Sequence, residues 1–395
     1  MADEASTFET NFVSQETNRP PYLDAAATTP VDPRVAELVI HLMTEEYGNA
    51  GSRTHGYGVD ALREVNKARE RIAHCLASTP DEVIFTSGAT EANNLGILGL
   101  AAHGSATGRR HIVSSTIEHK AVLEPLDHLR SCGFEVTLVR AGPSGRVSAE
   151  EVAAALRPDT LLVSVMHGNN ETGALQPIEE IAARLHDEDT FLHVDAAQTF
   201  GREPHALRNR RIDLISISGH KIFGPKGIGA LIVRRREGRR APIAPLMFGG
   251  GQERGLRPGT LPTPLIAGLG LAAELAEKEC EGRREQCLAI RSDALAALAR
   301  LKPILHGEGG PVLPHILSFA LPGIDSEAIM VSAKDLVAIS NGSACTSSHY
   351  APSHVLTAMG LQDDVVQGTI RLSWSHMTPP VAWDQFARRL DDLRF

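Results

Sequence analysis

Several short segments carry polar or nucleophilic side chains that a plain turn does not need. The stretch from Ser218 to Leu231, SGHKIFGPKGIGAL, places Lys221 among glycines directly after an apolar run. A lysine amine in a water-poor cleft has a lowered pKa and becomes a nucleophile toward aldehydes. The alternative is a glycine turn whose lysine points into water, and that interpretation suits Lys226. Glycines such as Gly227 and Gly229 let the chain fold tightly behind Lys221.

Three residues elsewhere could serve a bound heterocycle. Asp195 ends an apolar run, where an unpaired carboxylate is costly, so it needs a cationic partner such as a protonated ring nitrogen. Gln198 lies three residues further on and could bond another ring substituent. The alternative for Asp195 is an ordinary cap of the next helix. His119 could be a core residue, a stacking platform or a proton carrier.

Two more segments could bind charged groups. In TSGATEANN, from Thr86 to Asn94, a predicted strand leads into a helix whose first amides, with the Thr90 hydroxyl, would hold an anion. A simple helix cap is the alternative. Ser218 and His220 could bind the same anion. Asn170 lies in MHGNNETGALQPI, where asparagines form turns or donate side-chain amides to a ligand.

Together these residues form one inventory. It comprises an anion cradle, a ring-stacking residue, a carboxylate for a ring nitrogen, a glutamine for a ring oxygen and a lysine for an aldehyde. Pyridoxal 5'-phosphate (PLP) requires this set. The sequence therefore predicts a PLP site in which Lys221 forms the Schiff base with the cofactor.

Short apolar runs alternate with helical patterns from about residue 60 to 235 and must position these residues. This alternation predicts an α/β fold with a mostly parallel sheet covered by helices, and ligands bind beyond the carboxyl ends of such strands. Helices are expected at Ala149 to Leu156 and Ile178 to Leu185. The expected strands are Val83 to Ser87, His111 to Ser115, Glu135 to Val139, Leu161 to Met166, Phe191 to Val194 and Leu214 to Ile217.

The chain divides into three predicted parts. Residues 1–20 are expected to be a flexible tail, and residues 35–262 form the large PLP-binding domain. Residues 21–34 and 263–395 are expected to form a small α+β domain, in which the Ala- and Leu-rich stretch to Leu301 is helical. The arginines of Arg234–Arg236 and Arg239–Arg240 are expected to lie in a solvated turn.

Composition excludes several other roles. The net charge of -9 and the pI near 6.0 argue against direct nucleic-acid binding. No apolar run is long enough to cross a membrane, and the polar N-terminus is no secretion signal. The five cysteines have irregular spacings, which predicts reduced thiols, a cytoplasmic location and no cysteine metal site.

The motifs resemble those of the cysteine desulfurases, in the class V aminotransferase-like group of PLP fold-type I. The resemblance runs from YLDAAATTP, Tyr22 to Pro30, to IRLSW, Ile370 to Trp374. It implies a seven-stranded, mostly parallel sheet and an obligate homodimer. It also implies conversion of L-cysteine to L-alanine, with the sulfur passed to an acceptor protein.

Residue by residue, the resemblance implies a role for each motif. Lys221 holds the cofactor, and His119 stacks on its ring and moves protons. Thr260 reaches the phosphate in the partner subunit. Asn170 and Arg371 hold the substrate carboxylate, and Asn170 also contacts the cofactor. The remaining cofactor contacts are ring contacts by Asp195 and Gln198 and phosphate contacts by Ala89, Thr90, Ser218 and His220.

Cys345 decides the reaction. It lies in SNGSACTSS, whose small residues cannot pack a core, so we expect an exposed loop rather than a buried thiol. The thiolate would take the sulfur of L-cysteine as a persulfide, and the loop would carry it to the acceptor. The sequence around Cys345 resembles that of long-loop desulfurases.

The sequence leaves other activities open. A class V aminotransferase or a selenocysteine lyase would use the same fold, and a non-enzymatic persulfide-carrying scaffold would bind no PLP. Ala25 and Ala50 stand where many relatives have asparagine and proline, at positions expected near the substrate entrance. This variant resembles the desulfurases of bacterial DNA phosphorothioation systems. Iron-sulfur assembly, tRNA thiolation and DNA phosphorothioation all stay open as destinations of the sulfur.

Overall fold

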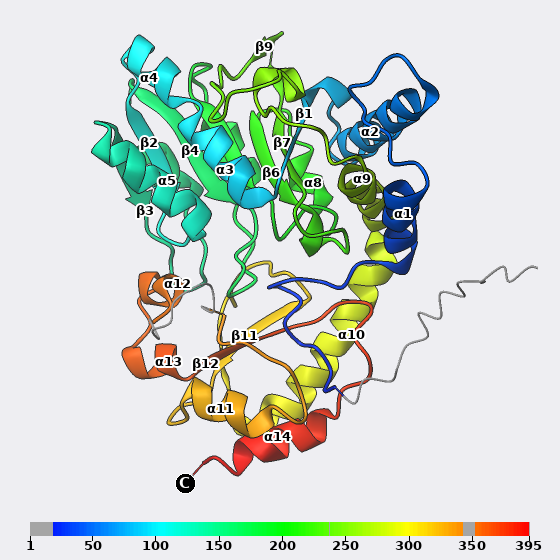
Figure 1. Cartoon of the computed structure of the whole chain (residues 1–395). Helices are drawn as coiled ribbons and strands as arrows, with labels where there is room; N and C mark the ends of the chain where they lie inside the picture. The colour runs from blue at the N-terminus through cyan, green and yellow to red at the C-terminus, as the bar shows by residue number, and fades with distance from the viewer. Residues whose placement is uncertain (1–18, 237, 343–351, 395) are drawn as a thin grey trace, which may run out of the picture.

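The computed structural model describes residues 19–236, 238–342 and 352–394. A large sheet with helices on both faces forms the upper part of the molecule in Figure 1, and a smaller sheet with its own helices lies below it. The predicted α/β class is therefore confirmed.

The large sheet has seven strands in the order β1-β7-β6-β5-β4-β2-β3. All neighbours are parallel except at β7, which runs antiparallel to both β1 and β6. The six strands expected from the apolar runs are all present within one or two residues. The bounds are β1 Val83–Thr86, β2 His111–Ser115, β3 Glu135–Val139, β4 Thr160–Met166, β5 Phe191–Asp195, β6 Leu214–Ser218 and β7 Gly229–Val233.

Alternating side chains of these strands feed two hydrophobic cores. In β4, for example, Val163 and Val165 belong to one core, and Leu162 belongs to the other. Parallel strands covered on both faces are apolar on both sides, which explains their unbroken hydrophobic runs. Helices α3 (Ala89–Leu98) and α5 (Lys120–Ser131) lie over one face in Figure 1. The other core takes residues from α1 (Pro33–Thr44), α2 (Gly56–Cys75), α6 (Ala149–Ala154), α7 (Ile178–Arg184) and α9 (Thr263–Lys278).

The helical stretch predicted up to Leu301 is divided at Glu279 into α9 and α10 (Cys280–Leu298). Buried residues of α9 such as Leu269 join the core of the large sheet, whereas Leu298 of α10 joins the core of the small sheet. The domain division at residue 262 stays a prediction, and the packing of α9 favours a boundary nearer Glu279.

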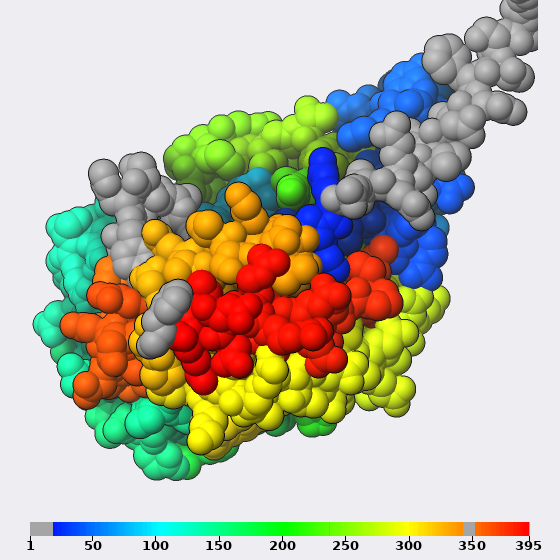
Figure 2. All heavy atoms as spheres, turned by 90° about the horizontal axis from the view of Figure 1, so that it is seen from below, coloured from blue at the N-terminus to red at the C-terminus, as the bar shows by residue number. Residues whose placement is uncertain are grey.

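The lower part contains a three-stranded antiparallel sheet in the order β10-β11-β12. The N-terminal segment joins it, because Tyr22 bridges Ala338 and Asp24 bridges Ser373. Seen from below, the C-terminal part of the chain, yellow to red, makes up most of this face (Figure 2). The bounds are β10 Ile304–Leu305, β11 Ile316–Ala320, β12 Thr369–Ser373, α11 Ser326–Ala333, α12 His354–Ala358, α13 Asp363–Gln367 and α14 Trp383–Asp391.

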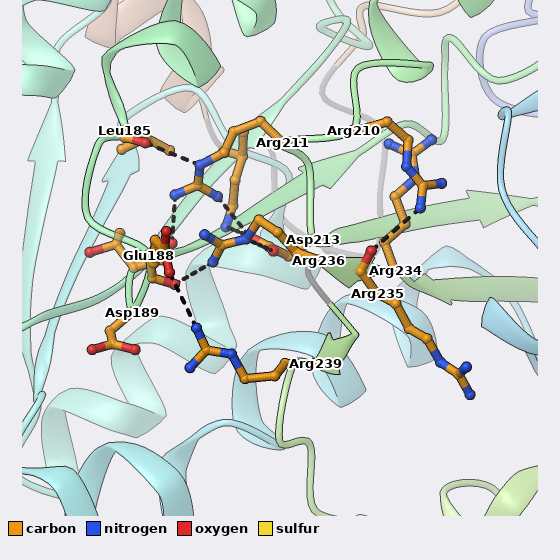
Figure 3. A network of polar contacts seen from close by, with 12 residues as sticks. Leu185, Glu188, Asp189, Arg210, Arg211, Asp213, Arg234, Arg235, Arg236 and Arg239 are labelled. Atoms are coloured by element: carbon orange, nitrogen blue, oxygen red, sulfur yellow. Dashed lines mark hydrogen bonds and ion pairs between the residues drawn. The ribbon is translucent and has the colours of Figure 1, made fainter.

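The arginine cluster after β7 departs from the expected solvated turn at Arg234, whereas Arg235 and Arg239 are exposed as expected. Arg234 is only 1% exposed and donates to the main-chain oxygens of Leu76, Leu207 and Asn209. Arg211 and Arg236 both bond the buried carboxylate of Asp213, as Figure 3 shows. The cluster therefore ties chain segments together at the start of β6, the end of the sheet opposite the carboxyl ends of its parallel strands.

Within the described ranges, no helix is long and apolar enough to cross a membrane. The same ranges contain no group of three or more histidine, cysteine or acidic side chains that could hold a metal ion.

Candidate active site

A cavity of about 540 Å³ opens where the carboxyl ends of the parallel strands meet the small sheet. It brings together nearly every residue that the sequence singled out. The predicted residues that line it are Ala89, Thr90, His119, Asn170, Asp195, Gln198, Ser218, His220, Lys221 and Arg371. We call this the main cavity.

Asp195 ends β5 and is 6% exposed. The side-chain amide of Asn93 donates to Oδ2 at 2.7 Å, and the main-chain N–H of Ala197 donates to Oδ1 at 2.9 Å. These two bonds hold both carboxylate oxygens in place at the cavity wall. Sequence reasoning missed Asn93, although it lies inside the TSGATEANN motif, because the contact depends on α3 lying against β5.

Lys221 follows β6 in a short 3-10 turn, Gly219–Lys221. Its amine donates to the main-chain oxygens of Ala26, at 2.5 Å, and Ala27, at 2.9 Å. Gln198 Nε2 donates to the same oxygen of Ala26 at 2.9 Å. The N-terminal segment therefore holds both polar side chains at the cavity wall.

The opposite end of the cavity is built from tightly packed backbone. A Cβ at Gly229 would lie 2.4 Å from the oxygen of Ile217 and 2.7 Å from the Cα of Gly88. Only glycine at position 229 lets these backbone segments come so close. This close packing places the start of α3 against the end of β6. The first amides of α3, at Ala89 and Thr90, have no cap from a side chain and are suited to an anion.

Two histidines face this cavity as neutral rings. His119 caps α5 and accepts the N–H of Ala121 at Nδ1, which places its proton on Nε2. Burial lowers the pKa of His119, and the charge of Lys221 lowers it further. Burial, with Lys221 and Lys226, lowers the pKa of His220 to about 4, and its Nδ1 lies 3.2 Å from the Thr28 hydroxyl.

Arg371 enters from β12 of the small sheet and is 4% exposed. Its Nη1 donates to the main-chain oxygen of Asn170 at 2.8 Å, and its Nη2 pairs with Asp24 at 2.6 Å. Nε is buried and has no hydrogen-bond partner within the described part of the chain. Sequence reasoning did not find Asp24, because its role depends on pairing between the N-terminal segment and β12.

Two predicted positions lie outside the main cavity, and a third belongs to residues that the structure does not describe. Thr260 lines a second cavity of about 300 Å³, together with Ala50 and Gln252. Ala50 is therefore not at the entrance of the main cavity, as expected, but beside Thr260. Cys345 lies outside the described residues, whereas Gly342, three residues before it, lines the main cavity.

The residues present fit PLP. Among the residues that the structure describes, Gln198 Oε1, Asn93 Oδ1 and Arg371 Nε are buried polar atoms without a partner, and buried polar atoms normally have one. The Asp195 carboxylate suits a protonated ring nitrogen, and the second N–H of the Gln198 amide suits a phenolic oxygen. The amides at the start of α3 suit a phosphate, and the lysine amine suits an aldehyde. Arg371 offers a guanidinium for a carboxylate.

Comparison with known proteins agrees with this chemistry. The model of the family Aminotransferase class-V matches residues 21–379. The cysteine desulfurase IscS of Vibrio vulnificus is 44% identical over 362 residues, which are 91% of this chain and 89% of the relative. The chain therefore belongs to the class V aminotransferase family, whose desulfurase members depend on PLP.

Solved structures narrow the assignment. DndA from Streptomyces lividans is 54% identical, with a TM-score of 0.79, and the match covers 90% of this chain and 99% of that one. SspA, solved in complex with cysteine, is 37% identical, with a TM-score of 0.78 and coverage of 91% and 99%. Within its family, this chain is an enzyme of the cysteine desulfurase type with the PLP fold-type I architecture.

Proposed function

We propose that the enzyme converts L-cysteine to L-alanine in the main cavity and transfers the sulfur to Cys345 as a persulfide. The observation that carries this proposal is the wall itself, where Asp195, Lys221 and Arg371 line one cavity. The Asp195 carboxylate matches a protonated ring nitrogen, the Lys221 amine can condense with an aldehyde carbon, and the Arg371 guanidinium matches a substrate carboxylate. An aminotransferase would use the same wall without Cys345.

PLP, when bound through the Lys221 amine, supplies an electron sink for the substrate's Cα. Asp195 keeps the ring nitrogen protonated, and Gln198 bonds the phenolic oxygen. Ala89, Thr90, Ser218 and His220 hold the phosphate, and neutral His119 stacks on the ring. Lys221 Nζ, once displaced, accepts the proton from Cα.

Arg371 and Asn170 orient the substrate. The guanidinium binds the carboxylate through Nε and exchanges its contact with Asp24 for one with the ligand. The Cys345 thiolate then attacks the substrate sulfur, an S–S bond forms, and the C–S bond breaks. Its electron pair passes to the carbon skeleton, which leaves as L-alanine after protonation.

The Cys345→Ser variant tests the reaction type. It should keep the visible absorption of bound PLP but release no sulfide in the presence of dithiothreitol, with the exposed Cys132 replaced as the control. Unchanged sulfide release by Cys345→Ser would refute the persulfide step. Amino-group transfer to a 2-oxo acid at the wild-type rate would favour an aminotransferase instead.

We further propose that the enzyme is a homodimer in which Thr260 completes the partner's phosphate site. Thr260 does not line the main cavity of its own chain. Large apolar side chains close in sequence to residues of the second cavity are exposed. Tyr47, two residues before Asn49, is 67% exposed, and Phe248, four residues before Gln252, is 88% exposed. A second copy of this chain would cover them, which explains why such large apolar groups face outward.

A mixing experiment separates action within one chain from action across the interface. Homodimers of Thr260→Ala and homodimers of Lys221→Ala should each have low activity at limiting PLP. In a mixed dimer, one site would regain both residues, so activity should rise above either parent. If Thr260 served its own chain, mixing would restore nothing.

We also propose that the sulfur acceptor belongs to a DNA phosphorothioation system. Ala25 and Ala50 support this proposal, as does the 54% identity to DndA. Capture of the acceptor on the Cys345 persulfide, with Cys345→Ser as the control, tests it. Transfer to an iron-sulfur scaffold alone would contradict it.

A further inference from the structure

A small cavity lies behind the main cavity, at the junction of α9 and α10, which follow one another down the right side of Figure 1. Its volume is about 40 Å³. We call it the junction cavity, and nothing in the proposed reaction uses it. Polar and apolar side chains share its wall, among them Arg202, Phe223, Cys280, Arg283, Arg284, Cys287, His315 and His376.

Two buried nitrogen atoms of this wall have no hydrogen-bond partner among the residues that the structure describes. They are Nε of Arg202 and Nε2 of His315, and His315 is only 2% exposed. An unsatisfied buried donor costs about 1–3 kcal/mol, and more when the group is charged. Two such atoms at one cavity indicate that something in the cavity bonds them.

The charges of the wall do not balance. Arg283 pairs with Glu279, and Arg284 pairs with Glu203. Arg202 has no carboxylate within ion-pair distance among the residues that the structure describes. Burial lowers the pKa of Arg202 only to about 10, so its guanidinium is charged near neutral pH. One positive charge is therefore left over.

The other polar groups of the wall do not neutralise it. Burial raises the pKa of the Cys287 thiol, which stays protonated, and the Cys280 thiol donates to the main-chain oxygen of Arg202 at 3.5 Å. Burial lowers the pKa of His315 well below its ordinary value, so that ring is neutral. Water would satisfy the two nitrogens but would leave the charge uncompensated.

We propose that the junction cavity binds one monovalent anion of halide size, such as chloride, between the N–H groups at Arg202 Nε and His315 Nε2, the neutral His315 ring carrying its proton on Nε2. A cavity of about 40 Å³ holds roughly three water molecules, which allows a halide but excludes a substrate or cofactor fragment. The guanidinium groups of Arg202 and Arg283 both lie over the ring of Phe223, with their central carbons 5.8 and 5.0 Å from the ring centroid. These cation–π contacts agree with a fixed positive charge at this wall.

The site is coupled to the catalytic centre through one side chain. Arg202 Nη2 donates to the main-chain oxygen of Lys221 at 2.8 Å. The anion at Nε and the Lys221 carbonyl at Nη2 therefore hold the same planar guanidinium. Binding of the anion fixes the arginine that supports the turn carrying the catalytic lysine.

Bromide is the probe for this site. In wild-type crystals grown or soaked in bromide, we expect an anomalous peak within hydrogen-bond distance of both Arg202 Nε and His315 Nε2. A cavity that contains only water under these conditions would overturn the proposal. The crystal measurement uses the wild-type protein, so it tests the proposal even if the Arg202 variant does not fold.

Solution measurements use matched variants. Replacing gluconate by chloride at constant ionic strength should raise the melting temperature of the wild type by about 1–3 °C. The rise should vanish in Arg202→Met and persist in Arg284→Gln, whose arginine lines the same cavity but is already paired with Glu203. An equal rise in Arg202→Met would show that chloride acts elsewhere and would contradict the proposal.

Discussion

The side-chain amide of Asn93 lies 2.7 Å from the carboxylate of Asp195 and fixes it from the side of α3. Asn93 is 1% exposed, so no water competes for this bond. Together with the N–H of Ala197, it orients both carboxylate oxygens before any ligand arrives. We propose that this carboxylate, which is preorganised, pairs with the ring nitrogen of the cofactor.

Asn93→Leu should weaken PLP binding. The change removes a hydrogen bond to a charged group, worth about 1.5–3 kcal/mol, so the dissociation constant should rise roughly ten- to a hundredfold. Titration of the apoenzyme by visible absorbance measures it. Asn94→Ala is the control, because Asn94 bonds only the helix oxygen of Thr90. Equal affinities for Asn93→Leu and wild type would remove Asn93 from the site.

Arg371→Lys should impair binding of L-cysteine rather than of PLP. An ammonium group keeps the charge but loses the planar fork that binds a carboxylate through two nitrogens. KM should rise about tenfold or more, while the absorbance of the bound cofactor stays as in wild type. The control is Arg389→Lys, which changes a surface pair with Asp335. A reduced affinity for PLP with unchanged KM would place Arg371 at the cofactor instead.

Glu118→Gln should flatten the pH dependence of stability. Burial raises the pKa of Glu118 to about 8, and its oxygens accept from Met166 N–H and the Ser115 hydroxyl. The folded state therefore binds a proton that the unfolded chain releases above its ordinary pKa of 4.5. Stability from this group is complete below pH 4.5 and is lost as the pH rises toward 8.

Denaturant unfolding at pH 5 and pH 7 measures this loss. The wild type should lose about 2 kcal/mol more than Glu118→Gln over that interval. Glutamine keeps an oxygen that accepts from the Met166 N–H and the Ser115 hydroxyl, and its NH2 group stands in place of the carboxyl O–H, so the comparison isolates the proton. Parallel pH profiles for the two proteins would show that Glu118 titrates normally.

Glu171→Ala should slow sulfur transfer while leaving PLP bound. The buried Glu171 carboxyl accepts the Ser353 hydroxyl at 2.5 Å, and a Cβ at Gly342 would lie 3.8 Å from Glu171 Cβ. Gly342 and Ser353 lie on either side of the segment that carries Cys345. Misplacing reacting groups by about 1 Å costs up to a hundredfold in rate.

Single-turnover persulfide formation is the measurement, with the exposed Glu179→Ala as the control. A rate equal to that of wild type would show that Glu171 only supports the fold. Loss of bound PLP in Glu171→Ala would show that the effect is not confined to sulfur transfer.

The location of the main cavity could be predicted from the sequence because parallel strands share one carboxyl edge. Asp195, Ser218 and Lys221 each follow an apolar run, so their meeting required only the correct strand order. Asn93 and Asp24 could not be found this way. Their roles depend on how α3 packs on the sheet and how the N-terminal segment pairs with β12. The local hydrophobic pattern of the sequence predicts neither of these contacts.

Other differences have the same cause. Arg234 follows a strand and precedes further arginines, a pattern that is typical of a turn. In the structure its guanidinium is buried and donates hydrogen bonds to main-chain oxygens of other segments. The helix after residue 262 divides at Glu279 where the chain passes from one core to the other. Thr260 matches the family motif, but its place in a second cavity follows from tertiary structure alone.

Reduction of the PLP-loaded enzyme with borohydride, followed by peptide mass spectrometry, tests the central claim most directly. Reduction locks the coenzyme onto the amine that carries it. We predict a pyridoxyl group on Lys221 alone, with Lys226 unmodified, and no modification in Lys221→Ala. Labelling of Lys226, or of no lysine at all, would contradict the account.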